Sequence, residues 1–299
     1  MKILLLGKNG QVGWELQRSL AVLGEIVALD RHSSDHCGDL TQLEALATTV
    51  RQLRPDVIVN AAAYTAVDKA ESEIELARTV NARAPEVLAR EAEQLGALLV
   101  HYSTDYVFDG SGTRPWNEQD LTGPLNVYGQ TKLEGERLIA AACERHLILR
   151  TSWVYGARGG NFIKTMLRLA QEGDKLTVID DQHGAPTSAE LLADVTAQAV
   201  RQGVGGVART DLRGTYHVAA AGETTWHGYA SHVVEQARRM RPGIRFPAAE
   251  VTAVSSAAFI TAARRPKNSR LDTAKLRAAL ALTLPPWQQG VDRVLAGIL

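Results

Sequence analysis

The first half of the chain alternates between short apolar runs and segments with helical periodicity. Residues 3–6 form a continuous apolar run that ends at Gly7, which predicts a strand buried on both faces of a parallel sheet. The next segment, residues 11–23, places apolar side chains at helical spacing, at Val12, Leu16, Leu20 and Leu23. The chain therefore opens with a strand, a tight turn and an amphipathic helix.

The same alternation continues to about residue 155. Further strands are predicted over residues 25–30, 56–60, 98–102 and 146–150. Further helices are predicted over residues 43–53, 75–94 with an interruption near Pro85, and 128–142. Strands and helices in this rhythm indicate βαβ units with right-handed crossovers. We predict an α/β fold with a Rossmann-type doubly wound parallel sheet.

Beyond residue 155 the pattern becomes irregular. Helices are predicted over residues 161–171, 189–201 and 272–280, a strand over 175–179, and at most a flexible connector over 203–206. We predict a dinucleotide-binding domain over residues 1–155. Residues 156–299 are then mainly a smaller, interleaved substrate-binding domain, with some elements packing back on the first.

Composition narrows the class of protein. The 299 residues are 45% hydrophobic and 22% charged with zero formal net charge, which is typical of a soluble globular protein and lacks a nucleic-acid footprint. Two cysteines are too few for a disulfide framework. The first apolar run is too short for a signal peptide, and no stretch approaches the length of a membrane span. We expect a cytoplasmic protein with no nucleic-acid or membrane partner.

Glycines spaced three apart follow the first strand, at Gly7, Gly10 and Gly13. Small residues let the backbone turn tightly and approach a pyrophosphate, and the first N–H groups of the helix, at Gln11 and Val12, favour negative charge. The spacing differs from the usual dinucleotide fingerprint. A purely structural turn between strand and helix is the alternative.

The end of the second predicted strand bears on the choice of cofactor. Asp30 lies 17 residues after Gly13, where an acidic residue would bind the adenosine ribose and favour NADH. Arg31 beside it would attract the 2′-phosphate of NADPH, unless it is a solvated loop charge. Asp39 and Leu40 follow at a distance suited to the adenine ring.

The segment after the third predicted strand is built from small residues. Ala62, Ala63, Tyr64 and Thr65 would let the backbone approach a cofactor, or would simply pack a helix against the sheet. Tyr102, at the end of a further predicted strand, is another candidate cofactor contact.

Tyr128 and Lys132 are the candidate catalytic pair. Spacing of four places both on one helical face, about one turn apart. A free phenol has a pKa of about 10, and a neighbouring ammonium lowers it, so that the pair can exchange a proton near neutral pH. Alone, such a pair is usually an exposed helical contact. The glycine turn and the upstream segment Ser103-Thr104-Asp105 favour catalysis.

Together these residues resemble the extended short-chain dehydrogenase/reductases, and more closely the dTDP-4-dehydrorhamnose reductase family. The similarity includes segments 103–110, 150–156, 181–187 and 265–271, and runs from residue 1 to about 295. It implies that NADPH or NADH delivers a hydride to the C4 ketone of dTDP-4-dehydro-6-deoxy-L-mannose, giving dTDP-L-rhamnose for polysaccharide biosynthesis.

The resemblance also implies roles for individual residues. Tyr128 would donate the proton, Lys132 would lower its pKa and hold the nicotinamide ribose, and Thr104 would hydrogen-bond the developing oxyanion. Asp105, Tyr106 and Trp153 would contact the dTDP-sugar, although Trp153 could instead be core. The family is associated with Mg²⁺ and with homodimers, but no ligand cluster in the sequence identifies a metal site.

Three other functions share these motifs. A 4,6-dehydratase of the superfamily carries an acidic pair after the threonine, whereas Asp105 is followed here by Tyr106. A 4-epimerase is usually longer, holds NAD tightly and has a denser glycine turn. A non-catalytic regulatory subunit, such as that of methionine adenosyltransferase, can retain both Tyr128 and Lys132, so only a turnover assay separates it from an enzyme.

Overall fold

The computed structural model describes residues 1–173, 175–204, 212–243, 247, 250–259 and 261–299. At its centre is a six-stranded parallel sheet with the strand order β10-β5-β4-β3-β1-β2. Its strands are β1 (Lys2–Leu6), β2 (Glu25–Leu29), β3 (Val57–Asn60), β4 (Leu98–Thr104), β5 (His146–Thr151) and β10 (Gly214–His217). The strand order reverses between β1 and β3, which is where open parallel sheets bind their ligands.

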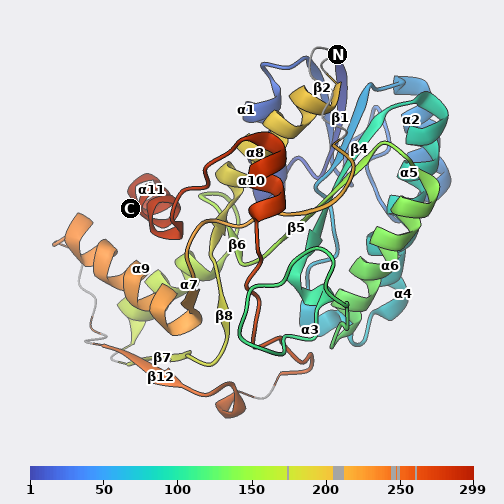
Figure 1. Cartoon of the computed structure of the whole chain (residues 1–299). Helices are drawn as coiled ribbons and strands as arrows, with labels where there is room; N and C mark the ends of the chain where they lie inside the picture. The colour runs from blue at the N-terminus through green and yellow to red at the C-terminus, as the bar shows by residue number, and fades with distance from the viewer. Residues whose placement is uncertain (174, 205–211, 244–246, 248–249, 260) are drawn as a thin grey trace.

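Helices cover both faces of this sheet (Figure 1). One face carries α1 (Gln11–Leu20), α8 (Ala189–Val204) and α10 (Ala274–Leu280). The other carries α2 (Leu43–Leu53), α5 (Ala84–Leu95) and α6 (Val127–Ala142), with the short α3 (Val67–Ala70) and α4 (Ile74–Arg78) near its end. A separate apolar core fills each face. The predicted doubly wound α/β fold is confirmed.

The predicted interruption near Pro85 is a change of helix type. A π-helical turn, η1 (Thr79–Arg83), joins α4 to α5 directly before Pro85. Within it the Asn81 side chain accepts a hydrogen bond from Tyr64 N at 2.9 Å and donates one to Tyr64 O at 3.1 Å. The irregular turn therefore fixes the segment that leaves β3.

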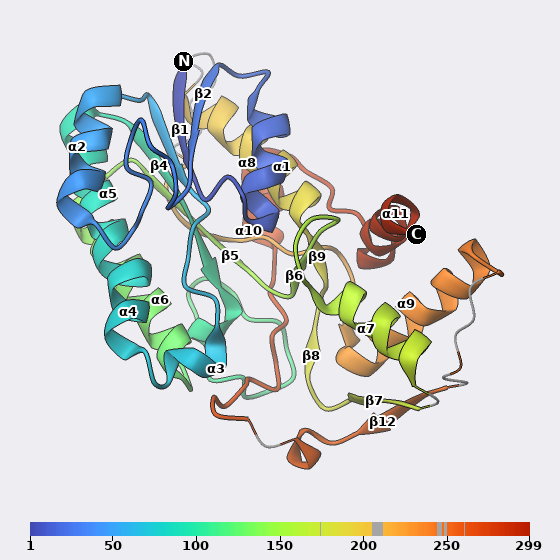
Figure 2. The same ribbon diagram turned by 180° about the vertical axis from the view of Figure 1, so that it is seen from behind.

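A second group of elements lies beyond the carboxyl ends of the sheet (Figure 2). It comprises α7 (Phe162–Glu172), β7 (Leu176–Ile179), α9 (Trp226–Met240), β12 (Val251–Val254) and α11 (Trp287–Ile298), packed around a core of their own. Short strand pairs connect it to the rest: β6 (Val154–Tyr155) with β9 (Thr187–Ser188), and β8 (His183–Gly184) with β11 (Thr224–Thr225). Two 3₁₀ turns complete the elements, η2 (Asp105–Val107) and η3 (Ser256–Ala258). Among the described residues, no helix is long and apolar enough to cross a membrane.

The second half of the chain contributes to both groups. Strand β10 extends the central sheet beside β5, and α8 and α10 pack on its face. The sequence pattern predicted α8 and α10 but missed β10, α9, β12 and α11. Residues 203 and 204 continue α8 instead of forming a connector, and residues 205 and 206 lie outside the described part of the chain. The assignment of cofactor to the first part and substrate to the second stays a prediction.

Candidate active site

A cavity of about 680 Å³ lies where the two groups of elements meet. Besides Tyr106, three aromatic side chains line it: Phe162 of α7, Trp226 of α9 and Phe259. Three cations, Arg264, Arg265 and Lys267, and the phenol Tyr106 also border it. The cavity thus combines apolar ring surfaces with three basic side chains, of which Arg265 and Lys267 are paired with Asp68 and Asp181.

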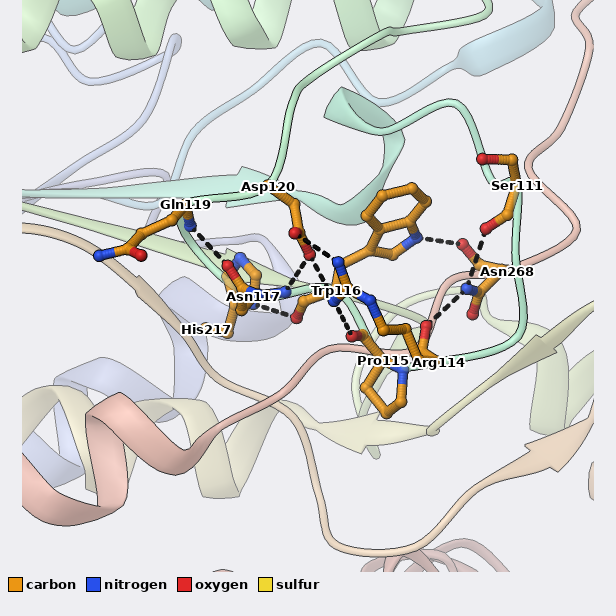
Figure 3. A network of polar contacts seen from close by, with 9 residues as sticks. All are labelled: Ser111, Arg114, Pro115, Trp116, Asn117, Gln119, Asp120, His217 and Asn268. Carbon is orange, nitrogen blue, oxygen red and sulfur yellow. Dashed lines mark hydrogen bonds and ion pairs between the residues drawn. The ribbon is translucent and has the colours of Figure 1, made fainter.

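A polar network fixes the loop on one side of this cavity (Figure 3). The buried Asn268 amide donates to the carbonyls of Ser111 and Arg114, at 3.2 and 2.8 Å. Trp116 Nε1 donates to Asn268 O at 3.0 Å, and the Trp116 carbonyl bonds to His217 Nδ1 at 3.0 Å. The loop after η2 is therefore tied to β10 and to the segment that carries the cations.

The predicted catalytic residues Tyr128 and Thr104 come together where α6 begins. Asn126 caps the helix by accepting a hydrogen bond from Gly129 N at 2.8 Å, which places Tyr128 in the first turn. The helix lies so close to η2 that a Cβ on Gly129 would be 2.3 Å from the carbonyl oxygen of Tyr106. Only glycine allows this approach, which brings Tyr128 beside Thr104.

Tyr128 is a phenol kept in its protonated form. Burial raises its pKa to about 12, while a hydrogen bond with Thr104 acts in the opposite direction. The ring of Tyr106, which borders the cavity, packs edge-on against the Tyr128 ring with centroids 5.6 Å apart. A protonated hydroxyl is the form that a proton donor requires.

Lys132 lies one turn further along α6 and is 1% exposed. Its amine contacts the carbonyl oxygen of Tyr102 at 2.6 Å and His101 Nε2 at 2.9 Å. Burial lowers the pKa of Lys132 to about 8. The predicted lowering of the Tyr128 pKa by Lys132 is wrong, because burial of the phenol raises this pKa and the amine is engaged on β4.

Asp105 is an almost fully buried carboxyl group beside Thr104. Thr104 Oγ1 donates to Asp105 Oδ1 at 3.0 Å, and Asp105 Oδ2 has no hydrogen-bond partner among the described residues. Burial raises the pKa of Asp105 to about 6, although hydrogen bonds with Ser269 and Thr104 lower it. An acceptor of this kind suits a donor hydroxyl.

The other predicted substrate residues differ in their positions. Tyr106 borders the cavity near Arg265, which is paired with Asp68 at 2.6 Å. Trp153 stacks on Trp226 with ring centroids 3.8 Å apart, and it does not border the cavity among the described residues. The structure therefore shows Trp153 supporting the aromatic wall that Trp226 presents.

The glycine turn has the features of an anion site. Gly7 has a φ of +87°, and a Cβ on Gly13 would lie 2.0 Å from the Gly7 carbonyl oxygen, so the turn requires both glycines. Gly10 precedes α1 and no side chain caps the helix, which leaves the N–H groups of Gln11 and Val12 available. The turn lies at the β1/β3 switch point, against Ala62. This backbone fits a dinucleotide pyrophosphate.

The remaining predicted cofactor residues lie around the same edge of the sheet. Ala63 and Thr65 are exposed, while the Tyr64 hydroxyl donates to Glu73 at 2.6 Å. Tyr102 offers its carbonyl to Lys132, but its hydroxyl bonds to Thr196 of α8 at 2.5 Å and points away from Lys132.

The turn after β2 carries both charges expected at the adenosine ribose. Although burial opposes ionisation, hydrogen bonds from His32 N, Ser33 and Asn9 hold the pKa of Asp30 below its ordinary value. Arg31 is exposed and contacts His32. Further along, the Asp39 carboxylate accepts from Thr41, and Leu40 is buried in the core beneath α2.

Comparison with known proteins agrees with this architecture. A family model described as RmlD substrate binding domain matches residues 1–299. A dTDP-4-dehydrorhamnose reductase of Escherichia coli K12 is 56% identical over 295 residues, covering 99% of this chain and 97% of the relative. Another from Burkholderia thailandensis is 45% identical and covers 100% of this chain and 99% of its own. The chain belongs to the dTDP-4-dehydrorhamnose reductase family.

Solved structures of the family have the same fold. The reductase of Clostridium acetobutylicum superposes with a TM-score of 0.89 at 34% identity, covering 100% of this chain and 99% of its own. The reductase of Bacillus anthracis, solved in complex with NADP, gives a TM-score of 0.88 at 34% identity and 99% coverage of both chains. A nicotinamide nucleotide is therefore bound by a family member with this architecture.

Sequence reasoning missed several residues of the site. Trp226 was overlooked because α9 was not predicted, and the role of Asn268 depends on contacts across 154 to 157 residues of chain. His101 belongs to none of the motifs found in the sequence, but its neighbour across the sheet is Asn60. In the described part of the chain, no group of three or more His, Cys, Asp or Glu side chains could hold a metal ion.

The contact between α6 and η2 makes Gly129→Ala a sensitive test. The added methyl group would clash with the Tyr106 carbonyl, so we expect a loss of about 1–3 kcal/mol in the free energy of unfolding. Displacement of Tyr128 should also lower kcat by about 100-fold. Urea unfolding and initial rates measure both effects. Gly297→Ala, with nothing within 4 Å of the added carbon, is the control and should not lose stability. A Gly129→Ala protein with normal kcat would contradict the importance of this contact.

The raised pKa of Asp105 leads to a second prediction, on how the free energy of unfolding depends on pH. The folded state raises the pKa of this carboxyl from 3.8 to about 6, so folding favours the protonated form and the protein loses stability as pH rises through that window. Asp105→Asn does not titrate. Its stability relative to the parent should therefore increase by up to about 3 kcal/mol between pH 4 and 7 and then stay constant. A difference in unfolding free energy that is independent of pH would show that Asp105 ionises normally.

Proposed function

We propose that the chain reduces the C4 ketone of dTDP-4-dehydro-6-deoxy-L-mannose to dTDP-L-rhamnose with NADPH or NADH. The observation that carries this proposal is the protonated Tyr128 hydroxyl, which is hydrogen-bonded to Thr104. The Tyr128 ring packs on Tyr106, which borders a cavity with three basic side chains. Membership of the family, whose relatives are named for this reaction, supplies the substrate.

The chain's own residues meet the needs of ketone reduction. When bound, the reduced nicotinamide supplies the hydride. As negative charge develops on the ketone oxygen, Thr104 stabilises it by hydrogen bonding and Tyr128 donates its proton. The turn from Gly7 to Gly13 would hold the pyrophosphate, and Lys132 would hold the nicotinamide ribose.

The cavity has groups for each part of a nucleotide sugar. Arg264 is exposed and forms no ion pair with the described residues, so it is the cation best placed to neutralise the diphosphate. The rings of Phe162, Trp226 and Phe259 offer apolar faces to the base. Asp105 would accept a hydrogen bond from a sugar hydroxyl. A cytoplasmic location and a homodimer remain part of the proposal, and we assign no metal site.

The dehydratase alternative lacks a residue that its chemistry needs. Tyr106 occupies the position after Asp105, and its pKa is raised by burial, so this phenol is a poor base. A non-catalytic regulatory subunit would not turn over the substrate. Incubation of the protein with the ketone and each reduced nicotinamide, followed by loss of cofactor absorbance, separates it from an enzyme.

Tyr128→Phe tests the proton donor. The ring is retained and only the hydroxyl is lost, so we expect kcat to fall by a factor of about 10²–10⁴ with little change in cofactor affinity. Steady-state rates and a cofactor titration measure these quantities. Tyr229→Phe removes a buried hydroxyl that has no partner and should leave kcat unchanged. Near-normal turnover of Tyr128→Phe would refute the assignment.

Arg31→Ala tests the choice of cofactor. Asp30 and Arg31 both lie at the expected ribose position, so we expect the parent protein to use NADH and NADPH with neither preferred by a wide margin. Loss of the guanidinium should raise the KM for NADPH more than that for NADH, because only NADPH carries the 2′-phosphate. Arg168→Ala on α7 removes a comparable exposed arginine as a control. Equal effects on both cofactors at one ionic strength would place Arg31 away from the 2′ position.

A further inference from the structure

A row of buried hydrogen bonds lies behind Lys132. Ala62 N donates to Asn60 Oδ1 at 3.1 Å, and Asn60 Nδ2 is 3.1 Å from His101 Nδ1. His101 Nε2 is in turn 2.9 Å from the Lys132 amine, which donates to Tyr102 O at 2.6 Å. Asn60, His101 and Lys132 are each 1% exposed. The row thus connects the turn after β3 to α6 without solvent.

The donor and acceptor of each hydrogen bond in this row follow from the first donor, the backbone N–H of Ala62. A backbone N–H can only donate, so Ala62 fixes Oδ1 as the Asn60 atom that faces it. The other Asn60 atom is then the amide nitrogen, which donates to His101. Nδ1 of His101 must therefore be an acceptor without a proton.

The same logic sets the state of the lysine. Burial lowers the pKa of His101 well below its ordinary value, so the ring is neutral and its proton lies on Nε2. That N–H points at the Lys132 amine. An ammonium there would set two donors face to face, whereas a neutral amine accepts this bond and still donates to Tyr102.

We propose that His101 is a positioning residue for Lys132, held by Asn60 in the tautomer whose Nε2–H points at the lysine amine. Asn60 and His101 thereby fix the rotamer of Lys132 and favour its neutral form. The structural part of this proposal stands alone, and its catalytic part rests on the proposed function.

The surroundings of Lys132 support this reading. Burial lowers its pKa to about 8, against an attraction to Glu136 on the same helix. Glu136 is itself held by Arg150 of β5 at 2.6 Å. Charged groups on the other elements around α6 have partners of their own: Arg78 with Glu134, Arg83 with Glu75, Arg51 with Glu91, Arg90 with Glu86, Arg265 with Asp68, and Asp105 with Thr104.

The first test uses the unmodified, unliganded protein. Long-range ¹⁵N–¹H spectra of its histidine rings distinguish a protonated ring nitrogen from a bare one. We expect His101 to be neutral with its proton on Nε2 between pH 6 and 8. A proton on Nδ1, or a charged ring, would overturn the proposal whatever the protein catalyses.

Asn60→Asp should reverse the donor and acceptor roles in the hydrogen bonds from residue 60 through His101 to Lys132. A carboxylate accepts from both Ala62 N and His101, so the ring proton should move to Nδ1 and Nε2 should accept from a lysine ammonium. We expect the tautomer to invert in the same spectra and the basic limb of the pH profile of kcat/KM to move up by about one unit. An unchanged tautomer in the folded variant would show that Asn60 does not control the ring.

Two substitutions of His101 separate positioning from packing. Glutamine places an amide nitrogen near the position of Nε2, whereas asparagine reaches only that of Nδ1. We expect His101→Asn to weaken cofactor binding and to lower kcat/KM by about tenfold, and His101→Gln to retain most of both. His232→Gln, at a hydrogen-bonded histidine on α9, is the control.

Fluorescence titration with NADPH measures binding without turnover, so it remains informative if the proposed reaction is wrong. Equal losses in the glutamine and asparagine variants would indicate packing alone and overturn the positioning role.

Discussion

The close approach of α6 to the turn after β4 is the constraint on which the site depends. No side chain fits between Gly129 and the Tyr106 carbonyl, and this fixes the height and rotation of the helix. Residues at successive turns of α6 are thereby positioned: Tyr128 lies beside Thr104, Lys132 contacts the carbonyl of Tyr102, and Glu136 pairs with the buried Arg150. One backbone contact thus aligns a proton donor, an amine and an ion pair.

Burial shifts three ionisable groups of the site toward their uncharged forms, and for the proton donor this suits reduction. Burial keeps the phenol of Tyr128 protonated, raises the pKa of Asp105 and lowers that of Lys132. Each shift has the same cause, the cost of placing charge in a poorly solvated site. The reading of Tyr128 and Lys132 as a directly coupled pair came from spacing alone, which gives no information on burial or on partners contributed by β4.

Periodicity predicted the central sheet and its helices because these strands are buried on both faces and read as apolar runs. It failed for β10, whose residues Gly214 to His217 include only one strongly apolar side chain, and for α9, which begins among polar residues. The glycine turn, Thr104, Tyr128 and Lys132 could be found because their chemistry requires short local motifs. Trp226, Arg264 and Asn268 could not, because their roles arise from contacts between distant segments.

Because the chain returns to the central sheet with α8, β10 and α10, its two groups of elements are not independent domains. Because β10, α8 and α10 come after the first elements of the second group, no single cut separates two complete folding units. A fragment ending at residue 155 would lack an edge strand and two of the three helices that cover one face, α8 and α10, leaving apolar surface of β4 and β5 in water. Exchange of the substrate-binding part between relatives would therefore need three segments, one before α8, one between β10 and α10, and one after α10. Mutations in either group should then unfold both together.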